Sequence, residues 1–165
     1  MKSFKQFVEE EITLPTGINR AVFVGQAVSP AAPKQVEKGV IISTMWGHIA
    51  YQLGGKQAYE KVRVADETGT NPGEDFKKVL EEYGPAVILV DEWVAYARQL
   101  NDKDQGTRLA GGDFDTQFTF AQWLTESAAS LDNIVVLISI PSSDLEVGGK
   151  RGKEALERLK HVVTR

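Results

Sequence analysis

The sequence predicts an α/β domain in which a short parallel sheet carries helices on both faces. Two runs of branched apolar residues, 86–91 and 134–140, are typical of strands that are buried on both sides. Segments with helical spacing lie before and between these runs, and such alternation is the pattern of layered α/β folds. A chain of 165 residues is long enough for one domain with a core and short for two. Residues 1–165 are therefore predicted to form a single domain.

Each further element follows from local spacing or from residues that end helices and strands. Residues 2–11 predict an amphipathic helix with Phe4, Phe7 and Val8 on one face. Gly54 and Gly55 separate two helical patterns, and Asp115 is a candidate N-cap. In chain order, we expect a helix and linker over 1–19, a strand over 20–26, a proline-rich loop over 29–39, helices over 44–53, 56–65 and 73–83, the central strand over 86–91, a helix over 93–100, a glycine-containing mobile loop over 101–113, a helix over 115–131, a strand over 133–140 and a helix over 153–163.

Bulk composition limits the classes of protein to which the chain can belong. Its 42% hydrophobic and 25% charged residues are typical of soluble globular proteins. The net charge of -4 gives the whole molecule no attraction to nucleic acid. The absence of cysteine excludes disulfides and thiol catalysis and fits a reducing compartment. The charged N-terminus does not resemble a signal peptide, and no apolar run has the length of a membrane span. We therefore expect a cytoplasmic protein without a membrane partner.

Two adjacent carboxylates, Asp91 and Glu92, follow the central strand directly. Ligands of parallel sheets bind beyond the carboxyl ends of the strands, where such a pair can handle a metal ion and a water molecule. In nucleotide hydrolases this pattern is the Walker B element, whose Asp helps to hold magnesium and whose Glu orients the attacking water. The structural interpretation is that the pair ends a strand and begins a helix, whose N-terminus favours negative charge. The motif is short and leaves both interpretations open.

The phosphate-binding loop Gly-x-x-x-x-Gly-Lys-Ser/Thr that accompanies a Walker B element is missing from the sequence. Residues 54–57 lack the hydroxyl residue, and the glycine-rich stretch 148–154 ends in Glu154 where Ser or Thr would hold magnesium. No cofactor-binding residue is therefore predicted in this chain. Ser139, near the end of the second apolar run, is a candidate for contact with the attacking water, although a strand serine more commonly bonds to the backbone.

The C-terminal segment is rich in basic residues. Such a helix is able to bind nucleic acid or the phosphates of a neighbour's nucleotide, but it is more often a solvated helix face, and we favour that interpretation. The histidines, His48 and His161, lie in helical patterns without metal-ligand spacing. The basic residues among the last sixteen are Lys150, Arg151, Lys153, Arg158, Lys160 and Arg165.

A combination of segments adds a more specific signal: residues 24–30, 44–47, 68–73, 90–98, 114–122 and 139–149. Together they resemble a family of large prokaryotic proteins known as domain of unknown function 499. Members of this family are described as AAA-like or P-loop ATPases, and their genes often lie beside DNA methyltransferase and helicase genes in phage-defence loci. The resemblance spans residues 20–165.

The resemblance implies a partial, three-layer domain of the P-loop NTPase type, in the additional-strand and AAA-like class. In the family the phosphate-binding loop lies upstream, so this chain resembles an internal fragment carrying the second, third and fourth strands, ordered fourth–third–second. By resemblance, Asp91 would hold magnesium through water, Glu92 would orient the attacking water, and Ser139 would sense the γ-phosphate. Mg²⁺ and ATP are then cofactors of the longer protein, and neither is expected to be bound to this chain alone.

The same resemblance sets the expected partners. The missing first strand would lie beside the strand of Ser139, which leaves an apolar edge in the isolated chain. The first expected partner is the remainder of the longer chain, and homo-oligomers and DNA-modification or defence proteins are further ones. The competing prediction is a non-enzymatic interaction module that self-associates through the exposed edge. A nucleic-acid-binding domain that uses the basic end is the third, and the net charge disfavours it.

Overall fold

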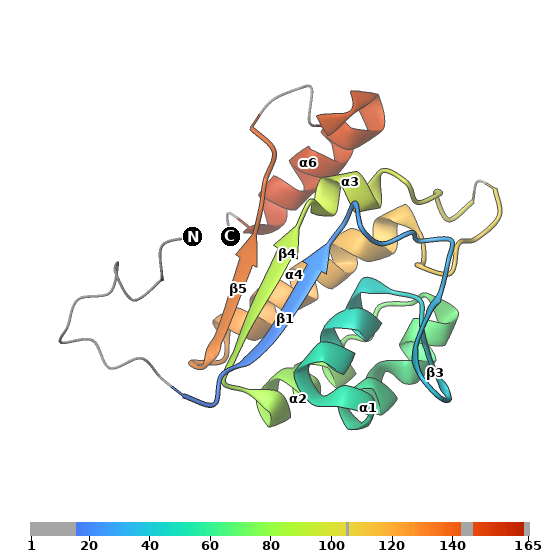
Figure 1. Ribbon diagram of the computed structural model, residues 1–165. Coiled ribbons are helices and arrows are strands. Elements are labelled where there is room, and N and C mark those ends of the chain that lie inside the picture. Colours follow the sequence, from blue (N-terminus) through green and yellow to red (C-terminus); the bar gives the residue numbers. More distant parts are fainter. Residues whose placement is uncertain (1–15, 105, 143–146, 164–165) are drawn as a thin grey trace, which may run out of the picture.

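A computed structural model describes residues 16–104, 106–142 and 147–163. At its centre lies a sheet of three parallel strands in the order β1–β4–β5 (Figure 1). This arrangement confirms the parallel α/β sheet and the predicted order of its strands. The helix predicted over residues 2–11 lies outside the described residues. The strands are β1 (Asn19–Val24), β4 (Ala86–Asp91) and β5 (Ile134–Ile138).

Helices form both connections of the sheet. The predicted helices over 44–53 and 56–65 merge into one, but Gly54 and Gly55 leave the helical conformation, so the predicted break is present. The last helix begins at Gly149, earlier than predicted. From β1 to β4 the chain passes through α1 (Met45–Thr68) and α2 (Glu74–Tyr83), from β4 to β5 through α3 (Trp93–Ala97) and α4 (Phe114–Ala129), and after β5 it reaches α6 (Gly149–Val163).

The predicted loop over 29–39 contains strand residues that the sequence analysis missed. An antiparallel hairpin joins β2 (Lys34–Glu37) to β3 (Val40–Ile42). Gly39 forms its turn with a φ of 82°, a conformation that glycine adopts at little cost. Both strands are short, and β3 is buried by parts of the chain that are distant in the sequence. The turn residues therefore dominate the local pattern, which predicts a loop.

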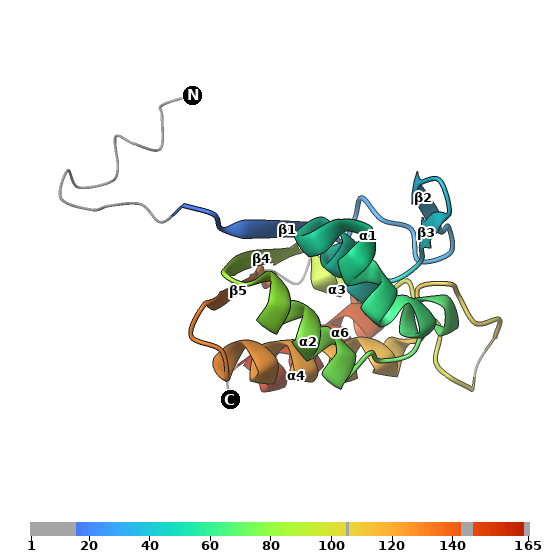
Figure 2. The ribbon, with the colours of Figure 1, turned by 90° about the horizontal axis from the view of Figure 1, so that it is seen from below.

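Within the described residues, helices cover one face of the sheet alone. Figure 2 shows α2, α4 and α6 on the same side of the strands. Ile88 points toward that side and is fully buried, whereas Val22, Val135 and Leu137 on the other face are 48%, 50% and 52% exposed. The expected second helical layer is absent from the described part of the chain. The prediction that β5 is buried on both faces is therefore wrong for this structure.

The two edges of the sheet also differ. At the β1 edge, the Gln52 side chain accepts a hydrogen bond from the Val22 N–H and donates one to the Val22 carbonyl, both at 2.9 Å. The amide pairs with the strand as a neighbouring strand would, which blocks further pairing there. β5 is the opposite edge, and no side chain in the described part of the chain bonds to its backbone in this way.

The histidine on α1 gives the fold a pH dependence. The His48 ring lies 5.9 Å from the Phe23 ring, measured between centroids, and burial together with nearby Lys34 lowers the pKa of His48 to about 4. The unfolded chain, with a histidine pKa of 6.5, binds more protons below that pH than the folded chain does. We therefore expect the free energy of unfolding to fall by about 1–3 kcal/mol as the pH decreases from about 6.5 to about 4.

Chemical denaturation at about pH 7 and about pH 4.5 measures this contribution. The difference in free energy of unfolding between the wild-type chain and His48→Gln should change between these pH values, because the variant lacks the titrating group. His161→Gln, at an exposed position on α6, is the matched control for the removal of a histidine. A His48→Gln difference that is independent of pH would contradict the assignment.

Candidate functional site at the carboxyl ends of the strands

A pocket of about 310 Å³ lies at the carboxyl ends of the three strands. Gln26 follows β1, Asp91 and Glu92 follow the apolar part of β4, and Ser139 follows β5, and all four residues line the pocket. Parallel strands bring their carboxyl ends to one edge of a sheet. The three site residues predicted from the sequence therefore meet, although Ser139 is 48 positions from Asp91.

The Ser139 hydroxyl connects the ends of two strands. It donates a hydrogen bond to Oδ1 of Asp91 at 2.5 Å and accepts one from the backbone N–H of Glu92 at 3.0 Å. The Ser139 N–H donates to the Val90 carbonyl at 3.0 Å, which extends the β4–β5 pairing to the pocket. Ser139 thus orients one carboxylate oxygen and also fixes the turn that follows β4.

Glu92 has a backbone conformation that is unusual for its residue type. With φ of 54° and ψ of 39° it lies in the left-handed region, which costs a non-glycine residue roughly 1–2 kcal/mol. Glu92 begins α3, yet its side chain makes no capping hydrogen bond. No side chain in the described part of the chain bonds to its carboxylate either. A backbone strained in this way around an unused carboxylate is typical of functional sites and favours the functional interpretation over helix capping.

Gly25 lets β1 pass close beneath this turn. Its N–H donates to the Asp91 carbonyl at 2.8 Å, and a Cβ atom at this position would lie 2.2 Å from the Glu92 carbonyl oxygen. Any side chain at Gly25 must therefore displace the Glu92 backbone. Sequence analysis assigned no role to Gly25 or to Gln26, because the approach of β1 to β4 is a tertiary contact with no local signal.

The donor set of the pocket suits a magnesium ion that is shared with a ligand. Mg²⁺ commonly takes one or two carboxylates and completes its shell with water and phosphate oxygens. The Oδ2 atom of Asp91 has no hydrogen-bond partner among the described residues. No group of three or more histidines or acidic residues able to hold a metal occurs in that part of the chain. Asp91 therefore fits the role of a single carboxylate ligand.

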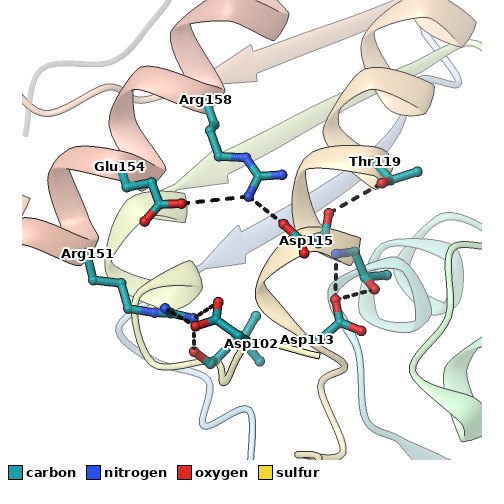
Figure 3. Close-up of polar contacts among 9 residues, drawn as sticks. Asp102, Asp113, Asp115, Thr119, Arg151, Glu154 and Arg158 are labelled. Atoms are coloured by element: carbon teal, nitrogen blue, oxygen red, sulfur yellow. Dashed lines mark hydrogen bonds and ion pairs between the residues drawn. The ribbon is translucent and has the colours of Figure 1, made fainter. Parts of the chain in front are cut away.

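The basic helix α6 is held against the rest of the domain by two of its arginines (Figure 3). Arg151 donates to both carboxylate oxygens of Asp102 at 2.9 Å, and its guanidinium lies 4.1 Å from the centre of the Phe114 ring. Arg158 pairs with Asp115 at 2.5 Å. These contacts fasten α6 to α4 and to the loop after α3, while the two arginine side chains remain 32% and 37% exposed. The lysines of the basic run are exposed as predicted, namely Lys150, Lys153 and Lys160.

The N-cap of α4 is Asp113, and the prediction of Asp115 at that place is wrong. Asp113 accepts a hydrogen bond from the Thr116 N–H at 2.8 Å. Both aspartates fit the local capping pattern, and the sequence does not reveal that Arg158 pairs with the second one (Figure 3).

Fold and pocket together define an α/β protein whose parallel strands end in a polar site with an Asp–Glu pair. The sequence model of the DUF499 N-terminal domain matches residues 2–165. The chain therefore belongs to the DUF499 family, as the resemblance predicted. Neither the curated proteins nor the solved structures contain a match to the chain. In the described ranges, every helix is too short or too polar to cross a lipid bilayer.

The contact between Gly25 and Glu92 predicts the effect of a substitution. Gly25→Ala should lower the free energy of unfolding by about 1–3 kcal/mol, because the new Cβ overlaps backbone atoms that cannot rotate away. Gly39→Ala is the matched control: that position has open space around it and a φ of 82°, so it should lose about 1 kcal/mol. Chemical denaturation compares the two variants, and a Gly25→Ala chain as stable as the wild type would contradict the close approach.

Proposed function

We propose that this pocket is the Walker B half of an ATP-hydrolysing site whose phosphate-binding half belongs to a longer protein. The proposal rests on one observation above all: the Ser139 hydroxyl bonds to the Asp91 carboxylate and to the Glu92 N–H. Two strands thereby present an acidic pair and a hydroxyl to the same small space. The family setting implied by the resemblance places such a protein in phage defence or DNA modification, and this setting is part of the proposal.

Each residue of the pocket has a distinct role in this proposal. Asp91 would hold Mg²⁺, and the ion supplies charge neutralisation on the phosphates when it is bound with ATP. The Glu92 carboxylate, which has no partner among the described residues, is able to orient a water molecule and to accept its proton. The Ser139 hydroxyl lines the pocket and donates its one proton to Asp91; in the proposal it exchanges this hydrogen bond for one to the terminal phosphate when ATP is bound.

The charges around the pocket indicate what is missing from the site. Its described lining contains two carboxylates and no lysine or arginine. A triphosphate brings several negative charges, which repel an acidic pocket unless cations and backbone N–H groups surround them. The sequence also has no Gly-x-x-x-x-Gly-Lys-Ser/Thr loop. In the proposal, the phosphate-binding groups are therefore supplied by the longer protein.

The chain on its own should show negligible ATP hydrolysis. A phosphate-release assay with Mg²⁺ and ATP tests the purified chain, with Glu92→Gln as the matched variant. We expect both proteins to remain at the background rate, because neither carries a phosphate-binding loop. Robust turnover by the wild-type chain that Glu92→Gln abolishes would contradict the division of the site between two segments.

In the longer protein, Glu92→Gln should reduce the rate of ATP hydrolysis by at least about a hundredfold while ATP binding persists. The reason is that an amide keeps the shape of the side chain but accepts no proton from water. Glu157→Gln is the control, because Glu157 is exposed on α6 and pairs there with Lys160. Phosphate release and nucleotide binding are measured in parallel. Turnover unchanged by Glu92→Gln would remove the basis of the proposal.

The alternative function is an interaction module that self-associates through the β5 edge. The half-exposed apolar residues of β5 favour it, since uncovered strands of this kind pair with other chains. It predicts a stable dimer without nucleotide response in both this chain and the longer protein. Nucleotide-dependent behaviour of the longer protein distinguishes the two functions.

A further inference from the structure

We propose that the open face of the sheet is a docking surface for the chain's own N-terminal segment, residues 2–11. Parallel sheets are found with both faces covered, because the connections between their strands carry helices. Here Val135 and Leu137 are about half exposed on one face, although their strand is as apolar as a buried one. Such a face requires a cover, and the position, pattern and length of residues 2–11 identify that cover.

The open face has the shape of a helix-binding surface. Strand register places Val22, Leu89 and Leu137 in one row across the sheet, and Val87 and Val135 lie side by side in the preceding row, which Arg20 completes at the β1 edge. Three strands spaced by about 4.8 Å span about 10 Å, which is the diameter of one helix with its side chains. One helix therefore covers these apolar rows.

The sequence of residues 2–11 matches this surface. Phe4, Phe7 and Val8 recur with helical spacing and predict one apolar face, while the remaining positions are polar: two lysines, three glutamates, Ser3 and Gln6. The match to the DUF499 N-terminal domain begins at residue 2, so the segment belongs to the same domain as the sheet. From residue 12 to the start of β1 at Asn19, seven residues are able to reach about 23 Å, which exceeds the width of the sheet.

The hand of the connections places the segment on the same face. Both crossovers, β1 to β4 and β4 to β5, step toward β5 and pass over the helix-covered face. Parallel crossovers are almost always right-handed. If the longer protein contributes a parallel strand beside β5, as the proposed function requires, the chain returning from it to β1 steps in the opposite direction. A connection of the same hand must then cross the open face, and residues 2–11 immediately precede β1.

Tethering favours this segment over a second copy of the chain. A short flexible linker gives a tethered segment an effective concentration of about millimolar. A second copy would need a comparable protein concentration to compete for the same apolar rows.

Cysteine chemistry tests the proposal in the intact chain, because the natural sequence has no cysteine. Leu137→Cys places a thiol on the open face, and Val64→Cys, at a valine that is 65% exposed on α1, is the matched control. In a maleimide-labelling assay we expect Leu137→Cys to react at least about tenfold more slowly than Val64→Cys. Addition of Phe4→Ser and Phe7→Ser should restore rapid labelling at position 137, whereas Lys5→Ser should not.

A second measurement covers the case in which the double serine variant fails to fold. The pair Phe7→Cys and Leu137→Cys, in an otherwise unaltered chain, should form a disulfide within one molecule on mild oxidation. Rapid labelling of Leu137→Cys in the folded monomer overturns the proposal. Protection that increases with protein concentration, or a disulfide between two molecules, also overturns it and assigns the face to a second copy. No nucleotide is used, so failure of the proposed ATPase function leaves these outcomes distinguishable.

Discussion

The common direction of the two parallel crossovers is the constraint on which the rest of this domain depends. Each connection leaves the carboxyl end of one strand, passes over the same face and returns to the amino end of the next strand in the order β1–β4–β5. Right-handed crossovers that step in one direction must use one face. This single rule collects the helices on one side of the sheet, brings all strand ends to one edge, and leaves the second face without cover from the described helices.

At that edge, a rigid backbone holds side chains that remain available. The Gly25 N–H and the Ser139 hydroxyl hold the carbonyl and the N–H of one peptide group, the one that joins Asp91 to Glu92, and together they sustain the left-handed conformation of Glu92. Contacts to the backbone stabilise this conformation, so the Glu92 carboxylate is not needed to hold the turn. A site of this kind keeps its geometry before any ligand arrives, which is the condition for electrostatic and proton-transfer catalysis.

The sequence predicted the parts of this site that follow from period and polarity. Asp91, Glu92 and Ser139 stand at the ends of apolar runs, and parallel topology alone brings such positions together. Gly25 could not be predicted, because its role is to have no side chain at a contact between strands. The half-exposure of Leu137 could not be predicted either. A run of apolar residues indicates that a strand is covered, but it does not indicate which element covers it.

Three incomplete features of the domain meet at β5, although the open face extends across the sheet to Val22 of β1. The strand has an uncovered face, its outer edge has no bonded neighbour among the described residues, and the pocket beside Ser139 is lined by carboxylates without a cation. By contrast, Gln52 closes the β1 edge. An exposed apolar face, an unpaired strand edge and a pocket that lacks positive charge all occur at β5. We take their coincidence to indicate a missing neighbour rather than an ordinary protein surface. A strand and a phosphate-binding loop added beside β5 would remedy the edge and the charge together, which is why we place the missing half of the proposed site there.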